Sequence, residues 1–317
     1  MVDANWRDRL TALDVDEVFQ VFEAARLADG REGIMGLPSF LTAAGAHLVV
    51  TTGGRIVGYA NLDTTGDSLG NQVAELVVHP AARRRGIGSR MVRALLDRAG
   101  DATLRVWSHG DHPAAAVLAD RFGFTRAREL RRMRWDAVPL PEPKPRDGVV
   151  IRAFVPGRDE AAVVEVNRRA FSWHPEQGRM TVADIERAES ESWFDPNGFF
   201  IAQETNSAQE TNSAQETNSA QETNSTGDTG GVLGFHWTRV HRGRDHKPIG
   251  EVYVVGVDPD AQGGGIGRAL TIAGLRHLHD VGLDRVMLYV EADNAAAIAV
   301  YVRLGFVAWD ADIQYAN

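Results

Sequence analysis

The feature that most constrains the fold of this chain is an internal repeat. Residues 75–88 correspond position by position to residues 254–267, at an offset of 179. Farther along, Phe122-Gly123-Phe124 matches Leu304-Gly305-Phe306 at an offset of 182. Because self-similarity of this kind marks a duplicated structural unit, the 317-residue chain is expected to fold as two similar domains.

Each copy contains a glycine pair between a predicted strand and a predicted helix. Gly86-Ile-Gly88 and Gly265-Ile-Gly267 both follow an apolar run and open a segment whose apolar residues recur at helical spacing. Glycines at such a junction let backbone N–H groups approach a pyrophosphate, and the helix N-terminus adds its positive dipole end. A tight turn uses such glycines without a ligand too, but two copies in register favour phosphate binding.

Two segments of unusual composition interrupt the chain. Prolines at positions 139, 141, 143 and 145 favour an extended spacer, so we expect an N-terminal domain at 1–138, a linker at 139–148 and a C-terminal domain at 149–317. The hexapeptide Gln-Glu-Thr-Asn-Ser-Ala recurs between Gln203 and Ser225 and contains no large apolar residue. It therefore predicts a disordered loop at 203–231 that enlarges a hairpin, most simply a tolerated repeat expansion; a functional polar tract is the alternative.

The hydrophobic pattern predicts an α/β fold with a mixed sheet in each half. Helices are expected at 86–98, 159–170, 181–191, 265–281 and 294–304. Strands are expected at 47–52, 56–62, 72–78, 102–106 and 126–135 in the first half, and at 149–154, 199–202, 232–240, 251–257, 285–290 and 307–310 in the second.

Composition excludes several classes of function. The chain has no cysteine, so disulfides, thiolate metal sites and a cysteine acyl-enzyme are ruled out. A formal net charge of −9 with no basic domain argues against nucleic acid as a partner. The N-terminus is charged and no apolar run reaches the length of a membrane span; we expect a cytoplasmic protein with no membrane association.

The glycine motifs identify a family resemblance. Arg83–Gly88 and Gln262–Gly267 resemble the Q/R-x-x-G-x-G/A signature of the GNAT superfamily of N-acetyltransferases, and Asn294–Phe306 resembles its closing motif, tyrosine included. Within that superfamily, the tandem halves and four segments of the second half resemble the mycothiol synthases; these segments are 174–178, 193–196, 234–238 and 250–254.

This resemblance implies two tandem GNAT-like domains, each a mostly antiparallel sheet flanked by helices. It implies an acyltransferase that moves the acetyl group of acetyl-CoA directly to the cysteine amine of desacetylmycothiol, a small-molecule substrate, with no metal. We expect a monomer. Two alternatives stay open: a GNAT enzyme for another amine, such as a protein N-terminus or an aminoglycoside, and a non-enzymatic acetyl-CoA sensor.

The resemblance also assigns residues. Glu251 is implied as the general base and Tyr301 as the general acid, and substrate contacts are implied at Glu176, Arg239, Glu251 and Tyr289. Acetyl-CoA contacts are implied at Leu76, Val77, Val78, Arg84, Arg85, Gly86, Ile87, Gly88 and Ser89 in the first half, and at Val255, Gly256, Val257, Gln262, Gly263, Gly264, Gly265, Ile266, Gly267, Arg268, Asn294, Ala295, Ala296, Ala297, Ile298 and Ala299 in the second.

The sequence departs from the family pattern at two places. Gly263-Gly264 stands where two basic residues are usual, so the phosphates lose side-chain charge. An acidic substrate contact expected a few residues after Asp29-Gly30 would fall on Glu32 only with a shifted register.

The repeat also predicts that the first half does not catalyse. An offset of 179 places Gln72 at the position of Glu251, and an offset of 182 places Ala119 at the position of Tyr301. An amide cannot accept the amine's proton as a carboxylate does, and a methyl group cannot donate one. The first half is therefore expected to bind CoA or support the substrate groove.

Overall fold

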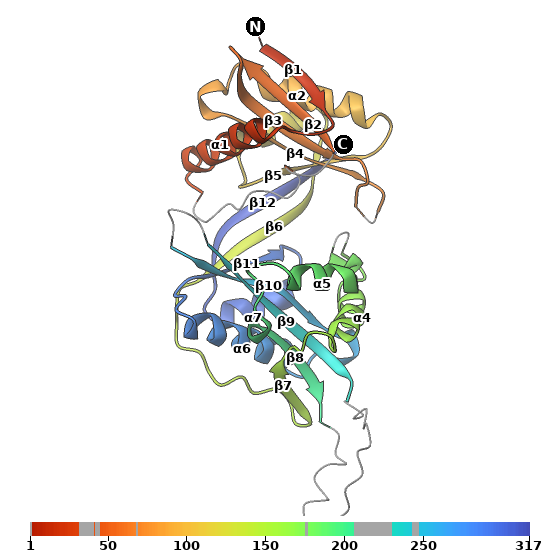
Figure 1. Ribbon diagram of the computed structural model, residues 1–317, viewed down its shortest axis with the longest axis vertical. Coiled ribbons are helices and arrows are strands. Elements are labelled where there is room, and N and C mark those ends of the chain that lie inside the picture. The colour runs from red at the N-terminus through yellow and green to blue at the C-terminus, as the bar shows by residue number, and fades with distance from the viewer. Residues whose placement is uncertain are drawn as a thin grey trace, which may run out of the picture. The chain divides into compact units, whose positions relative to one another are not determined.

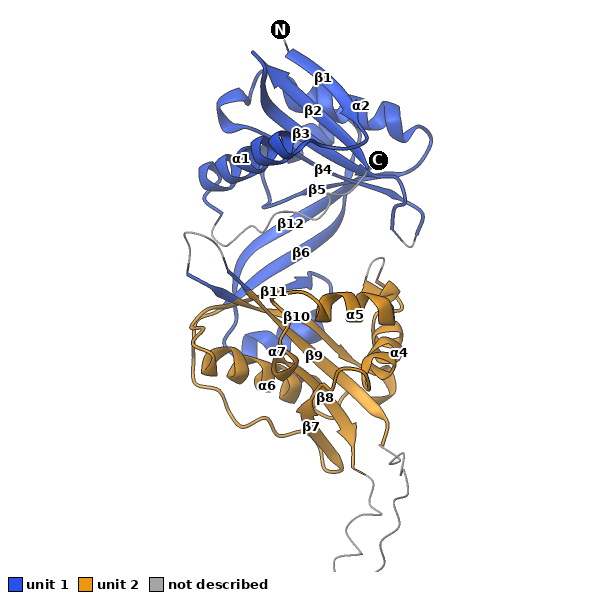
Figure 2. Cartoon of the chain, viewed as in Figure 1, with its two compact units in different colours: residues 1–134, 241–249, 289–317 blue, residues 135–240, 250–288 orange. Residues whose placement is uncertain are grey.

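The structure is a computed structural model that describes residues 2–31, 41, 45–67, 69–174, 177–205, 230–242 and 247–317. Contacts divide the chain into two compact units, of which the first comprises residues 1–134, 241–249 and 289–317 and the second residues 135–240 and 250–288 (Figure 2). This division differs from the boundaries expected from the sequence because residues 289–317 pack with the N-terminal half. No helix among the described residues is both long and apolar enough to cross a membrane.

The first unit is a sheet with helices packed against it (Figure 1). Its strands lie in the order β1-β2-β3-β4-β5-β12-β6. Neighbours are antiparallel except for β4 and β5, which are parallel. The elements are β1 (Val2–Arg7), α1 (Ala12–Ala28), β2 (Ala46–Thr52), β3 (Arg55–Asp63), β4 (Gln72–Val78), α2 (Ile87–Ala99), β5 (Leu104–Ser108), α3 (Pro113–Arg121), β6 (Thr125–Trp135), α7 (Ala295–Arg303) and β12 (Val307–Ala316).

The parallel pair β4 and β5 opens part of the way along its length. The two strands pair from Gln72 opposite Leu104 to Glu75 opposite Trp107. Beyond that point, Leu76–Val78 continue to pair with β3 but not with β5. The edge of β4 that faces β5 is therefore unpaired along these residues, where an extended ligand could add to it.

The last strand of the chain completes the sheet of the first unit. β12 lies between β5 and β6, with Ile313 opposite both Ser108 and Glu129. Ile313 and Tyr315 are 0% and 6% exposed and belong to the same apolar core as Met91. The strand expected at 307–310 is confirmed, but it is longer than predicted and fills the core of the first unit.

The second unit repeats the same plan. Its strands lie in the order β11-β10-β9-β8-β7, with β10 parallel to β11 from Gly250 opposite Val286, as β4 is to β5. The elements are β7 (Val149–Ala153), α4 (Glu160–Ala170), α5 (Val182–Glu189), β8 (Phe199–Glu204), β9 (Val232–His241), β10 (Ile249–Val257), α6 (Ile266–Asp280) and β11 (Val286–Glu291). The predicted duplication and α/β class are confirmed.

The predicted disordered loop at 203–231 is wrong at its first residues. Gln203 and Glu204 belong to β8, because the side chain of Gln203 is buried and hydrogen-bonded on both sides. Its Oε1 accepts from Arg152 Nε at 2.6 Å, and its Nε2 donates to the carbonyl of Gly230 at 2.9 Å. Residues 206–229 lie outside the described residues, and disorder there stays a prediction.

Helix α6 packs closely against the sheet of the second unit at Gly274, where there is no room for a side chain. A Cβ built on Gly274 would lie 2.0 Å from Cε1 of His236 on β9. The His236 ring is fully buried and its Nδ1 lies 2.8 Å from the carbonyl oxygen of Leu270. Burial lowers the pKa of His236 to about 4, so the ring is neutral at pH 7 and packs as an apolar group.

We expect Gly274→Ala to lower the free energy of unfolding by about 1–3 kcal/mol, the usual cost of overpacking a core, although alanine is the better helix former. Urea unfolding measures the change. The double variant Gly274→Ala/His236→Ala should lose less stability than the two single changes added together. Wild-type stability in Gly274→Ala would contradict this packing.

Candidate functional site

The glycine turn of the second copy leaves a helix N-terminus open. Gly265 is the N-cap of α6 and makes no side-chain capping bond. Gly263 and Gly265 have φ of +85° and +73°, in the left-handed region that glycine adopts without strain. The N–H groups of the first turn of α6 are therefore available to an anion.

The first copy has the same turn. Gly86 caps α2 at φ +79° without a side-chain bond, and Arg84, the counterpart of Gly263, has φ +62°. Arg83 Nε donates to the carbonyl of Val78 at 3.1 Å, as Gln262 Nε2 does to that of Val257 at 3.3 Å. Residues 179 positions apart thus have the same backbone conformation and the same hydrogen bonds in the two turns. This conformation suits a pyrophosphate in either turn.

A cavity of about 1260 Å³ occupies the first unit where β4 and β5 separate. Of the acetyl-CoA contacts expected in the first half, Arg85 does not line it. The others all do: Leu76, Val77, Val78, Arg84, Gly86, Ile87, Gly88 and Ser89.

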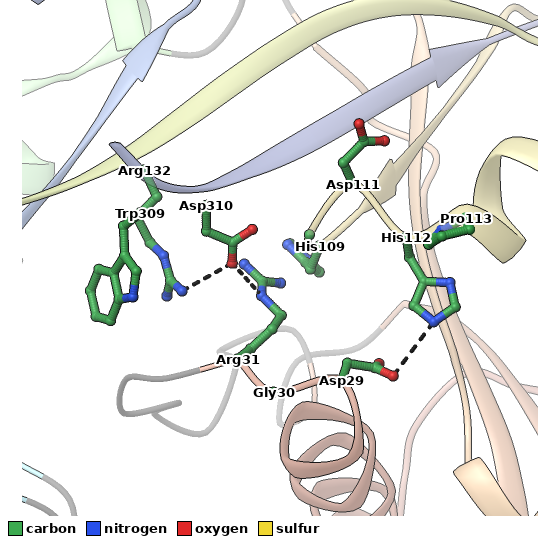
Figure 3. A pocket seen from close by; sticks show the side chains of 11 residues that line it. Asp29, Gly30, Arg31, His109, Asp111, His112, Pro113, Arg132, Trp309 and Asp310 are labelled. Carbon is green, nitrogen blue, oxygen red and sulfur yellow. Dashed lines mark hydrogen bonds and ion pairs between the residues drawn. The ribbon is translucent and has the colours of Figure 1, made fainter. Parts of the chain in front are cut away.

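A smaller pocket of about 420 Å³ in the first unit is lined mainly by charged groups (Figure 3). Arg31 forms ion pairs with Asp310 at 2.9 Å and Asp312 at 2.7 Å. Arg132 pairs with Asp310 at 3.0 Å, and its guanidinium carbon lies 4.1 Å from the centre of the Trp309 ring. These bonds fasten β12 to the loop after α1 and to β6.

His109 extends this network to β4. Its Nδ1 lies 3.2 Å from Asp312 and its Nε2 3.1 Å from Glu75. Burial opposes the charged imidazole, but the two carboxylates outweigh it and raise the pKa of His109 to about 10. Burial likewise opposes the ionised Asp312, and His109 and Arg31 outweigh it and lower the pKa of Asp312 to about 2. Sequence patterns do not reveal this network, because its members lie far apart along the chain.

Asp312 makes the free energy of unfolding of the first unit depend on pH. Its pKa is depressed on folding, so its contribution is present above about pH 4 and is lost as pH falls toward 2. We expect wild type to exceed Asp312→Asn in free energy of unfolding by about 2 kcal/mol at pH 5–6, and the gap to close between pH 4 and 2. Urea titrations at each pH measure it, and a gap independent of pH would contradict the assignment.

The second unit places two of the expected residues on neighbouring strands. Glu251 lies on β10 with 8% of its surface exposed. Arg239 lies on β9 with its guanidinium carbon 4.4 Å from the centre of the Trp193 ring and 5.6 Å from that of Tyr253. Burial raises the pKa of Tyr253; the nearby cation of Arg239 opposes this rise, and Glu251 adds to it. The rings of Trp193 and Tyr253 thus form an aromatic platform for the cation of Arg239.

The remaining expected residues are placed as follows. Tyr289 lies on β11, is 37% exposed and lines the cavity of the first unit. Tyr301 on α7 is 9% exposed and packs edge-on against Phe306 at 5.6 Å. Burial raises the pKa of Tyr301 to about 12, so the phenol keeps its proton at neutral pH. The side chain of Asn294 caps α7 by accepting from the N–H of Ala297 at 3.1 Å. Glu176 and Glu32 lie outside the described residues.

No cluster of three or more metal-ligating side chains occurs in the described part of the chain. The assignments of Glu251 and Tyr301 to catalysis rest on the family motif, since contacts place them in different units.

Comparison with known proteins agrees with the duplicated fold. The model of the acetyltransferase (GNAT) family matches residues 171–306, and that of the acetyltransferase (GNAT) domain matches residues 43–126. Among solved structures, a GCN5-related N-acetyltransferase from Sphaerobacter thermophilus has a TM-score of 0.73 at 21% identity, covering 99% of this chain and 95% of its own. A tandem GNAT protein from the clavulanic acid biosynthesis pathway has a TM-score of 0.63 at 20% identity, covering 99% and 98%.

Curated relatives cover nearly the whole chain. The mycothiol acetyltransferase of Amycolatopsis mediterranei is 50% identical over 99% of this chain and 98% of its own length. That of Saccharomonospora viridis is 49% identical over 98% of both. The chain therefore belongs to the mycothiol acetyltransferase family of tandem GNAT acetyltransferases.

Proposed function

We propose that this protein is the acetyltransferase that converts desacetylmycothiol to mycothiol, taking the acetyl group directly from acetyl-CoA. The observation that carries the proposal is the identity of 50% with a mycothiol acetyltransferase over 99% of the chain. The absence of cysteine supports direct transfer rather than a thioester on the enzyme. We further propose that it acts as a monomer in the cytoplasm.

The chemistry requires a base and an acid. An amine attacks a thioester only in its neutral form, so a base must take its proton, and the departing thiolate is stabilised by gaining one. We assign the first role to Glu251, a carboxylate almost fully buried on β10. Tyr301, whose pKa is raised to about 12, holds the proton that the second role needs.

Acetyl-CoA is proposed to extend along the end of β10. The backbone of Val255, Gly256 and Val257 would pair with the pantetheine arm as an added strand and offer an N–H to the thioester oxygen. The turn at 262–268 would hold the pyrophosphate on the N-terminus of α6, and residues 294–299 would line the CoA. Glu176, Arg239, Glu251 and Tyr289 are proposed to contact the acceptor.

The first half is proposed to bind acetyl-CoA without catalysing. Its cavity and its uncapped Gly86 turn support binding. Gln72 and Ala119 at the positions of the base and the acid lack the groups that would transfer protons.

The competing function is acetylation of another amine by the same machinery. Purified protein is to be assayed with acetyl-CoA and a panel containing desacetylmycothiol, an aminoglycoside and a peptide N-terminus. We expect kcat/KM to be highest for desacetylmycothiol by at least tenfold, because specificity resides in the acceptor groove. A higher value for either other amine would replace the proposed substrate, and CoA binding without any transfer would favour a sensor.

A further inference from the structure

The two pyrophosphate turns differ in charge at two adjacent positions. The first copy carries Arg84-Arg85 before its glycine pair, whereas the second carries Gly263-Gly264. Gly263 has φ +85°, so its backbone alone favours glycine. Gly264 is not among the residues with positive φ, so its backbone admits any side chain. Position 264 could therefore carry a basic side chain as far as its backbone is concerned.

The side chain of Arg146 lies over Gly264. A Cβ built on Gly264 would lie 2.8 Å from Cδ of Arg146 and 3.4 Å from its Nη1. The arginine therefore occupies the volume into which a side chain at position 264 would extend. In the first copy, the basic side chains belong to the turn itself. In the second copy, the basic side chain next to the turn comes from another segment of the chain.

Arg146 comes from the segment that links the two halves of the sequence, and that segment is fastened along α6. Glu142 accepts from Arg276 of α6 at 3.0 and 2.8 Å, and Pro145 precedes Arg146 and restricts the backbone. Arg146 is exposed, and no carboxylate among the described residues forms an ion pair with it, whereas Arg276 and Arg285 are both paired. Its guanidinium is available to an anionic ligand.

We propose that Arg146 binds the pyrophosphate of acetyl-CoA in the second copy and supplies a cation to a turn that has Gly263-Gly264 where the first copy has Arg84-Arg85. The inference rests on the proposed use of this turn for acetyl-CoA. The N–H groups at the start of α6 supply hydrogen bonds and the positive dipole end, and Arg146 adds a full charge and a planar pair of donors suited to phosphate oxygens. The linker thereby contributes to the cofactor site as well as joining the two halves.

The test is the acetyl-CoA dependence of turnover in the full-length protein. Arg146→Ala should raise KM for acetyl-CoA about three- to tenfold with kcat nearly unchanged, as loss of one exposed charged contact predicts. Arg146→Lys should recover part of the loss, and the effect should shrink as salt is raised. Lys144→Ala, which removes a cation two residues away in the same linker, is the matched control and should leave KM unchanged.

Two further measurements separate phosphate binding from a structural role. S-acetylpantetheine lacks the pyrophosphate, so Arg146→Ala and wild type should use it equally well. Arg146→Ala/Gly264→Arg returns the cation to the turn itself and should restore KM for acetyl-CoA. An unchanged KM in Arg146→Ala, or an equal loss with S-acetylpantetheine, would overturn the proposal. Because each value is a ratio to wild type, a wild-type protein without acetyltransferase activity would instead contradict the proposed function.

Discussion

Glu251→Gln is expected to lower turnover about 10²–10⁴-fold, the usual contribution of a general base, with acetyl-CoA binding nearly intact. The amide keeps the size of the carboxylate but cannot accept the amine's proton. Glu251 lies on β10 before the residues proposed to pair with pantetheine, so the CoA contacts are unaffected. Steady-state kinetics give the loss in kcat, and calorimetry gives the affinity for CoA.

Tyr301→Phe is the matched variant for the acid. It keeps the ring that packs against Phe306 and removes only the hydroxyl, so thermal unfolding should change little while turnover falls by a similar order. Wild-type turnover in both variants would show that neither residue takes part in proton transfer.

Removal of residues 307–317 is expected to unfold the first unit, although its other sheet strands all lie in the N-terminal half. The deletion takes away β12 and leaves the facing edges of β5 and β6 unpaired. It removes the buried side chains of Ile313 and Tyr315, each worth about 2–5 kcal/mol as a large-to-small change. It also removes the buried carboxylate of Asp312, with which both Arg31 and His109 pair. Together with the unpaired strand edges, these losses are comparable with the typical stability of a domain, about 5–15 kcal/mol.

Hydrogen exchange of the β4 and β5 amides measures this directly, and an N-terminal fragment of residues 1–138 should likewise fail to protect them. The control is a chain that lacks only Asn317, which should retain protection at the β4 and β5 amides other than that of Leu104, whose N–H donates to the Asn317 side chain. Ile313→Ala in the full chain should cost about 2–5 kcal/mol without abolishing the fold. Protected amides in the chain that ends at residue 306 would show that the N-terminal half folds without β12.

The elements that occur in both copies could be predicted from the sequence. The glycine pairs and the offset between the copies predicted two strand-to-helix turns, and both helices start within a residue of the expected place, with Gly86 and Gly265 as N-caps. The turn at Gly53-Gly54 is local in the same way, since both glycines have positive φ and join β2 to β3. These features depend on residues near one another in the chain.

Features that depend on distant residues could not be predicted. Nothing in the local pattern of 307–316 tells a strand of its own half from one that pairs with Ser108 and Glu129. The link from Glu75 through His109 to Asp312 spans most of the chain for the same reason. The missing charge at Gly263-Gly264 was visible in the sequence, but the side chain that lies over Gly264 could be found only from the packing of Arg146. Strand β1 and helix α1 were missed as well.

The most direct test of the account follows the acetyl group itself. The purified protein is to be incubated with acetyl-CoA labelled in the acetyl group and with desacetylmycothiol, and the label located in protein and product by mass spectrometry. We predict one label on the cysteinyl nitrogen of each product molecule, CoA released in equal amount, and no label covalently attached to the protein before the acceptor is added. Label covalently attached to the protein, label on the thiol sulfur alone, or no transfer to this acceptor would contradict the account.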